Sequence, residues 1–228
     1  MTVPLNTIRL EPVKKAAASV IWLHGLGADG YDFMPVIKQM DLPEIHSVRF
    51  VLPNAPMQPV TLNNGMTMPS WYDIYGIGKQ FDEDDSGIRK SEAAVRQLIQ
   101  AELDLGVAHN RIFLVGFSQG GALALHTGLR LEQPLAGLIA LSTYLPLRDR
   151  IEVELNHVQK RTPICIMHGR QDEVVPIEFA ELSFEILKHQ GLDCRWHEYT
   201  MEHNLCADQI IDIKEFIVNQ LKDINGMC

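Results

Sequence analysis

The chain has 228 residues, of which 46% are hydrophobic and 21% are charged, and its formal net charge is −9. A chain of this length and composition can bury a large apolar core, which excludes disorder as its main state. This excess of acidic over basic residues gives no electrostatic reason to expect nucleic acid or an anionic membrane as a main partner.

The first twenty residues contain no apolar segment like that of a secretory signal peptide, and no later stretch is long enough to span a bilayer. The four cysteines, at positions 165, 194, 206 and 228, show no CxxC pairing and are too few to cross-link the chain. We therefore expect reduced thiols, no integral membrane segment and a cytoplasmic location.

Short apolar runs typical of strands buried on both faces recur along the chain. They cover Ser19–Leu23, Val48–Leu52, Ile112–Gly116, Gly137–Leu141 and Ile164–Met167, and a last candidate strand covers Arg195–Tyr199. Helical patterns lie between them, including one over Ile88–Leu105 and an apolar stripe from Ile210 to Ile224. Alternating strands and helices predict an α/β fold, with a mostly parallel sheet, helices on both faces and one domain over residues 1–228.

The exception is Pro53–Asp84, a long passage rich in Pro, Asn, Met and aromatic residues that joins a strand to a helix. Loops of this length are usually functional or disordered, and side chains such as Met66, Trp71 and Ile74 argue against disorder. These side chains fit an apolar wall beside a binding site. They fit a cover over the edge of the sheet equally well.

The run Gly116-Phe-Ser118-Gln-Gly120 follows a predicted buried strand and opens a helix rich in small residues. In that context a Gly-x-Ser-x-Gly pattern predicts a nucleophile elbow, in which a strained turn lifts the serine above the sheet. The positive end of the helix dipole then lies at the hydroxyl. Ser118 is therefore the predicted nucleophile, and an ordinary turn serine is the alternative.

Serine needs a base that a third group orients, and in this fold the acid and then the histidine follow the nucleophile. Asp172 follows the predicted strand that ends near His168, and His203 lies between the last strand and a helix that begins near Ala207. Side chains at the carboxyl ends of parallel strands reach the site crevice. We therefore predict Asp172 as the acid and His203 as the base.

Other residues compete for these roles. Glu173 is the main rival for the acid and Asp149 a weaker one, whereas His168 competes with His203 but precedes Asp172 in the chain. No HExxH or similar spacing is present, so no metal is expected.

Acyl transfer also needs hydrogen-bond donors for the oxyanion. The predicted donors are the backbone N–H of Gln119, next to the nucleophile, and that of Leu26 in the glycine-rich loop His24–Gly30. A phosphate-binding loop is the alternative for that loop, but its spacing is not GxGxxG.

Motifs over almost the whole chain point the same way: Trp22-Leu-His24-Gly-Leu-Gly27, Thr61-Leu-Asn, Pro69-Ser-Trp71-Tyr-Asp73-Ile, Gly116-Phe-Ser-Gln-Gly-Gly121, Leu141-Ser-Thr-Tyr-Leu-Pro146 and Gly169-Arg-Gln-Asp-Glu-Val-Val-Pro176. With them the chain closely resembles the phospholipase/carboxylesterase family, which includes bacterial carboxylesterases and the acyl-protein thioesterases. The resemblance implies an α/β-hydrolase fold, no cofactor, and hydrolysis of acyl esters, lysophospholipids or S-acylated proteins, often by a homodimer. It supports Ser118, Asp172 and His203 as the triad, and Leu26 and Gln119 as oxyanion donors.

The run Thr200-Met-Glu202-His203 departs from that family, which usually has glycine and methionine before the catalytic histidine, with a small or neutral residue between. The loop before the predicted base therefore carries an additional carboxylate.

These residues together predict a serine hydrolase of carboxylic esters or thioesters. Ser118 attacks an acyl carbonyl, His203 transfers the proton to the leaving group, and Asp172 holds the imidazolium. The acyl chain is expected to lie along apolar side chains, namely Leu26, Met66, Trp71, Ile74, Tyr144 and Val175. A non-catalytic binding or scaffold protein of the same fold is the strongest alternative, and a metal-dependent hydrolase is a more distant one.

Overall fold

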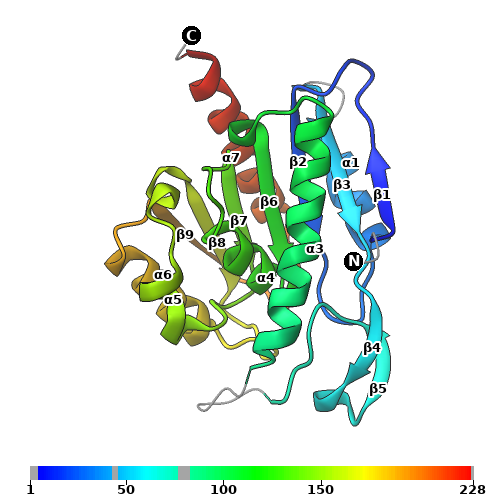
Figure 1. The fold of residues 1–228 in the computed structure, drawn as a ribbon, viewed down its shortest axis with the longest axis vertical. Helices are drawn as coiled ribbons and strands as arrows, with labels where there is room; N and C mark the ends of the chain where they lie inside the picture. The colour runs from blue at the N-terminus through cyan, green and yellow to red at the C-terminus, as the bar shows by residue number, and fades with distance from the viewer. Residues whose placement is uncertain (1–4, 43–45, 77–82, 227–228) are drawn as a thin grey trace.

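A seven-stranded sheet in the order β1-β3-β2-β6-β7-β8-β9 runs through the molecule (Figure 1). The computed structural model describes residues 5–42, 46–76 and 83–226, with side chains of the last helix described as far as residue 222. The strands are β1 (Thr7–Leu10), β2 (Ala18–Leu23), β3 (Val48–Pro53), β6 (Ile112–Phe117), β7 (Gly137–Leu141), β8 (Ile164–Gly169) and β9 (Cys194–Tyr199). Strand β1 pairs antiparallel with β3, and the other neighbouring pairs are parallel.

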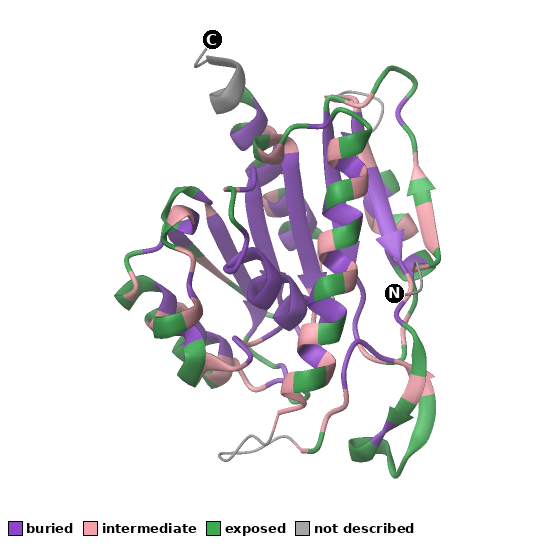
Figure 2. Ribbon diagram, viewed as in Figure 1, coloured by how far each residue is buried: buried purple, intermediate pink, exposed green. Residues whose placement is uncertain are grey.

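Helices cover both faces of this sheet. They are α1 (Met34–Met40), α3 (Asp85–Asp104), α4 (Gln119–Gly128), α5 (Ile151–Glu154), α6 (Ile177–His189) and α7 (Ala207–Gly226). Apolar side chains of α3, α4 and α6 form one core cluster with the sheet, and those of α1 and α7 form a second cluster on the other face. Figure 2 shows the central strands as buried between helices that are exposed on their outer sides.

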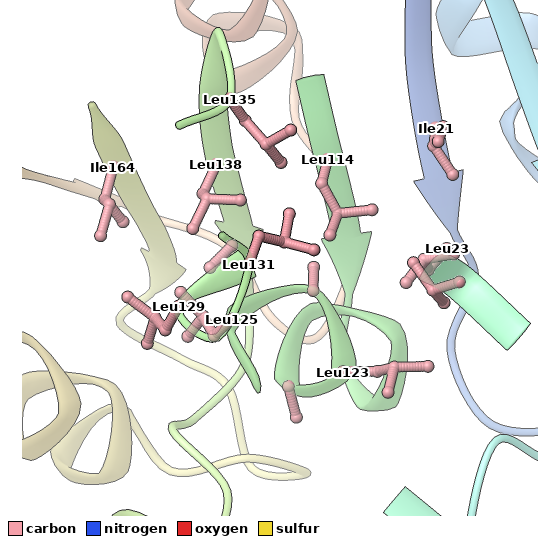
Figure 3. Close-up of a cluster of buried hydrophobic side chains, with 14 of the residues drawn as sticks. Ile21, Leu23, Leu114, Leu123, Leu125, Leu129, Leu131, Leu135, Leu138 and Ile164 are labelled. Atoms are coloured by element: carbon pink, nitrogen blue, oxygen red, sulfur yellow. The ribbon is translucent and has the colours of Figure 1, made fainter. Parts of the chain in front are cut away.

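The first of these core clusters lies around α4, which packs against the middle of the sheet (Figure 3). Leu114 of β6 and Leu138 of β7 face it, and both are fully buried. Because β2, β6, β7 and β8 are covered on both faces, their sequences read as continuous apolar runs.

The mostly parallel α/β sheet predicted from the sequence is confirmed. Each of the six predicted strands is present, with ends that differ by at most two residues from the prediction, and the two predicted helices correspond to α3 and α7. Strand β1 escaped prediction because it is four residues long and only partly buried at the edge of the sheet.

The passage Pro53–Asp84 contains a hairpin of its own. Strands β4 (Met57–Val60) and β5 (Met66–Pro69) pair antiparallel, and a 3₁₀ turn over Thr61–Asn63 lies between them. This hairpin lies beyond one end of the main sheet (Figure 1). Residues 77–82 of the passage lie outside the described residues.

Three of the four cysteines lie in the described part of the chain, and all three are free thiols. Cys165 in β8 and Cys194 at the start of β9 are buried, whereas Cys206 is half-buried. Among the described residues, no helix has the length and apolar character needed to cross a membrane.

Candidate active site

Ser118 lies in the sharp turn between β6 and α4, with φ 53° and ψ −121°. A residue other than glycine rarely adopts such a positive φ, so the surrounding structure must hold it. Two contacts do so: the Ser118 N–H donates to the Leu141 carbonyl at 2.9 Å, and the Thr143 hydroxyl donates to the Ser118 carbonyl at 2.7 Å.

The glycines on either side of Ser118 have no room for a side chain. A Cβ atom on Gly116 would lie 2.2 Å from the Gly120 carbonyl oxygen, and one on Gly120 would lie 2.3 Å from the Leu23 carbonyl oxygen. Strand β6, the turn and the start of α4 therefore pack backbone against backbone. This is the close packing that a nucleophile elbow requires.

Asp172 and His203, from the loops after β8 and β9, meet at the carboxyl end of the sheet. His203 Nδ1 lies 2.7 Å from Asp172 Oδ2. The other carboxylate oxygen, Oδ1, accepts hydrogen bonds from the N–H groups of Val174 at 3.0 Å and Val175 at 2.8 Å. The imidazole of His203 also packs on the ring of Phe117, with a centroid distance of 4.7 Å.

His168 lies behind Asp172 and is fully buried. Its Nε2 is 2.8 Å from the Val175 carbonyl oxygen and 3.3 Å from Asp172 Oδ2. Burial raises the pKa of Asp172, but hydrogen bonds from His168, His203 and the Val175 N–H outweigh burial and hold this pKa well below its usual range. The carboxylate is therefore ionised at neutral pH.

The competing acids are exposed to solvent, unlike the buried Asp172. Glu173 is exposed, and the Asp149 side chain is 99% exposed. Among the described residues, no group of three or more His, Cys, Asp or Glu side chains is arranged to hold a metal ion.

A cavity of about 450 Å³ opens at this end of the sheet, and both Ser118 and His203 line it. Of the predicted oxyanion and substrate residues it is lined by Leu26, Gln119, Ile74, Tyr144 and Val175. The lining also includes side chains that the sequence analysis missed, among them Phe33, Val36, Phe117, Phe179 and Leu205. Phe117 directly precedes the predicted nucleophile in the sequence, and this was the available signal.

Met66 and Trp71 were predicted for the same wall, and the structure corrects both assignments. Met66 lies in β5 of the hairpin, where it is 64% exposed and does not line the cavity. Trp71 is buried, with 1% exposure, and packs against His24 instead of facing the cavity. The next residue, Tyr72, lines the cavity where Trp71 does not, because the chain bends at these two residues.

Two tyrosines add polar groups to the mostly apolar lining. The hydroxyl groups of Tyr72 and Tyr144 lie 3.2 Å apart. Burial raises the pKa of Tyr72 well above its usual range and that of Tyr144 to about 12. Both phenols are therefore neutral at pH 7, and they give this side of the cavity hydrogen-bonding capacity without charge.

The backbone N–H groups of Leu26 and Gln119 belong to two elements that meet beside Ser118. Gln119 is the first residue of α4, so its N–H has no helical carbonyl one turn earlier to bond. Leu26 lies in the loop after β2, next to Gly27, whose φ of 75° lets this loop turn sharply. Both residues line the cavity.

Comparison with known proteins relates the whole chain to a family of hydrolases. The sequence profile of the phospholipase/carboxylesterase family matches residues 8–221. The chain is 36% identical to acyl-protein thioesterase 1 of Cryptococcus neoformans, covering 97% of this chain and 100% of that protein. It is 37% identical to acyl-protein thioesterase 1 of Emericella nidulans, covering 94% and 95% respectively.

Solved structures show the same fold. The crystal structure of Arabidopsis thaliana SOBER1 superimposes with a TM-score of 0.85 at 30% identity, covering 90% of this chain and 99% of that one. Zea mays acyl-protein thioesterase 2 gives a TM-score of 0.85 at 23% identity, covering 95% and 99%. The predicted α/β-hydrolase fold is thereby confirmed.

Proposed function

Since the chain belongs to the phospholipase/carboxylesterase family of hydrolases, we propose that it cleaves carboxylic esters or thioesters of acyl chains with Ser118, His203 and Asp172. One observation carries the proposal. The buried Asp172 carboxylate holds His203 Nδ1 at 2.7 Å, beside a cavity that Ser118 also lines. A base oriented by an ionised acid next to a strained serine is the arrangement that acyl transfer requires.

The reaction proceeds in two halves. Ser118 Oγ attacks the carbonyl carbon while His203 Nε2 takes its proton, and the N–H groups of Leu26 and Gln119 donate to the oxyanion. Collapse of this intermediate releases the alcohol or thiol, which receives the proton from His203. Water then attacks the acyl-enzyme by the same route, and Asp172 stabilises the imidazolium in both halves.

The substrate in this proposal carries an acyl chain that lies along the apolar cavity lining. Relatives named acyl-protein thioesterases support an S-acylated protein as the substrate, and lysophospholipids and small acyl esters fit the same chemistry. No step in the proposal uses a metal or cofactor. A homodimer and a cytoplasmic location stay predictions.

Replacement of the nucleophile tests the function directly. We expect Ser118→Ala to lower kcat on a p-nitrophenyl ester by roughly four to six orders of magnitude and to abolish fluorophosphonate labelling. Ser142→Ala is a matched control, because Ser142 also has a positive φ, of 48°, and directly follows the neighbouring strand β7. It should keep its activity.

The same assay separates the alternatives. A scaffold protein would neither turn over the ester nor be labelled, and a metal-dependent hydrolase would lose activity in a chelator. Substantial turnover by a clean Ser118→Ala preparation would contradict the assignment of the nucleophile.

A further inference from the structure

One short segment, Pro69–Trp71, forms hydrogen bonds with the loop that carries Leu26, one before that residue in the chain and one after it. Before Leu26, the indole Nε1–H of Trp71 donates to the His24 carbonyl at 2.8 Å. After Leu26, the Gly27 N–H donates to the Pro69 carbonyl at 2.9 Å. The segment therefore fixes the direction in which the peptide between His24 and Gly27 presents its N–H groups.

The segment is in turn tied to the start of α4 by the side chain of Gln119. Its Oε1 accepts from the Trp71 N–H at 2.9 Å, and its Nε2 donates to the Tyr72 carbonyl at 2.7 Å and to the Ser70 hydroxyl at 2.9 Å. Gln119 is 3% exposed. Its side-chain amide therefore forms these bonds away from water, where misplaced partners are costly.

The ring of His24 completes the fixation of the loop. Its Nε2 accepts from the Ala55 N–H at 2.9 Å, so this nitrogen carries no proton, and Nδ1–H donates to the Gly25 carbonyl at 2.7 Å. Burial lowers the pKa of His24, which agrees with a neutral ring. The ring of Trp71 packs on this imidazole with a centroid distance of 5.1 Å.

We propose that Trp71 is a positioning residue for the oxyanion hole, holding the Leu26 N–H at a set distance from the Gln119 N–H through its bonds to His24 and the Gln119 side chain. The inference rests on the proposed function. Oxyanion stabilisation depends on donors held in place before the reaction, and a misplacement of about 1 Å can cost roughly a hundredfold in rate. Trp71 therefore acts on the transition state without touching the substrate.

Trp22 offers a matched control for the loss of an indole. It is fully buried like Trp71, but its Nε1 has no hydrogen-bond partner in the described part of the chain. Trp22→Phe and Trp71→Phe remove the same volume from the core. Only the second removes a bond to the loop that carries Leu26.

Both variants should be assayed for kcat and KM on acetyl and medium-chain p-nitrophenyl esters. Inhibition by a trifluoromethyl ketone should also be measured, because its serine adduct places an oxyanion in the hole. For Trp71→Phe we expect kcat to fall about ten- to a hundredfold on both esters, with little change in KM and a parallel loss of inhibitor affinity. Trp22→Phe should change these values less than threefold, and thermal unfolding reports the stability of both variants.

Two results would overturn the proposal. One is a kcat for Trp71→Phe that falls no further than that of Trp22→Phe. The other is a loss that appears in KM and grows with acyl chain length, which would make Trp71 part of the substrate wall. If Trp71→Phe does not fold, Gln119→Met tests the proposal instead. This variant keeps the backbone N–H of residue 119 but removes the side-chain hydrogen bonds to the segment, so it should show the same loss in kcat.

The Ser118→Ala assay tests the proposed function separately from the role of Trp71. If the unaltered chain hydrolyses esters and Ser118→Ala does not, the function stands. The comparison of Trp71→Phe with Trp22→Phe then concerns only the positioning of the hole.

Discussion

The Asp172 carboxylate accepts hydrogen bonds on both of its oxygens, and these contacts determine what the residue can do. The N–H groups of Val174 and Val175 occupy Oδ1, while His203 and His168 approach Oδ2. With its pKa held well below the usual range, the carboxylate stays ionised as the pH falls. It therefore keeps His203 in the tautomer with a proton on Nδ1, which leaves Nε2 free to act as a base.

Asp172→Asn should consequently lower kcat by roughly ten-thousandfold, because an amide can hold the imidazole in the wrong tautomer and cannot stabilise its charge. Glu173→Gln is the matched control, since the neighbouring carboxylate is exposed. The measurement is kcat on one ester for both variants. A larger loss in Glu173→Gln would identify that residue as the acid.

At the scale of elements, the β4–β5 hairpin is fastened to the cavity wall by its turn. Thr61 donates from its N–H to Asp73 Oδ1 at 2.7 Å and from its hydroxyl to Asp73 Oδ2 at 2.6 Å. The Leu62 N–H then donates to the Ile74 carbonyl at 2.8 Å. These bonds hold Leu62 and Ile74 side by side at the cavity, so the hairpin contributes to the wall through its turn.

We expect Ile74→Ala to lower kcat/KM on a medium-chain ester by about ten- to a hundredfold more than on an acetyl ester, because only the longer chain reaches this wall. Met66→Ala, in the β4–β5 hairpin but outside the cavity lining, should change kcat/KM on the two substrates equally little. An equal loss on both esters for Ile74→Ala would indicate a structural role.

The sequence predicted the elements whose residues are all buried or all follow one pattern. It did not predict the direction of side chains in segments where burial changes from one residue to the next. The buried strands read as apolar runs, and the elbow around Ser118 needs glycines that a pattern can recognise. Trp71 and Met66 were misplaced because composition reports that a segment is apolar but not which side chain faces which space. The Gln119 side chain gave no signal at all, since its partners lie almost fifty residues away.

At the scale of the whole molecule, strand order brings together groups that are far apart in the chain. Strands β2 and β6 are neighbours, which places the loop of Leu26 beside Ser118, and β8 and β9 are neighbours, which places Asp172 beside His203. Strand β7 separates the two pairs. The proposed site therefore exists only when the sheet is complete, so stability of the fold and activity should be lost together.

Acid should weaken this fold in two separate pH ranges. His24 has a lowered pKa in the folded state, so below about pH 6.5 the unfolded chain binds a proton that the folded chain does not. Each such proton lowers the unfolding free energy by up to about 1.4 kcal/mol per pH unit. The contribution of Asp172, whose folded pKa is also lowered, is present above about pH 4 and is lost below it.

Urea unfolding between pH 7.5 and 5.5 should therefore show a stability that falls with pH, and the slope should be shallower in His24→Asn. The contribution of Asp172 does not change in this range, and the buried His126, whose pKa is also lowered, contributes equally in both proteins, so the difference between the two slopes isolates His24. An identical slope in the variant would show that His24 takes up its proton without a change in stability.

The rates at which the buried thiols of β8 and β9 react with a thiol reagent should report how this part of the sheet opens. Burial raises the pKa of Cys165 and of Cys194 to about 12, so almost no thiolate is available to a maleimide while the strands stay in place. Strand β9 lies at an edge of the sheet, whereas β8 is paired on both sides. Among the three cysteines in the described part of the chain, time-resolved labelling followed by mass spectrometry should find the half-buried Cys206 modified first, Cys194 next and Cys165 last. Simultaneous modification of the two strand cysteines would mean that this edge opens only with the whole sheet.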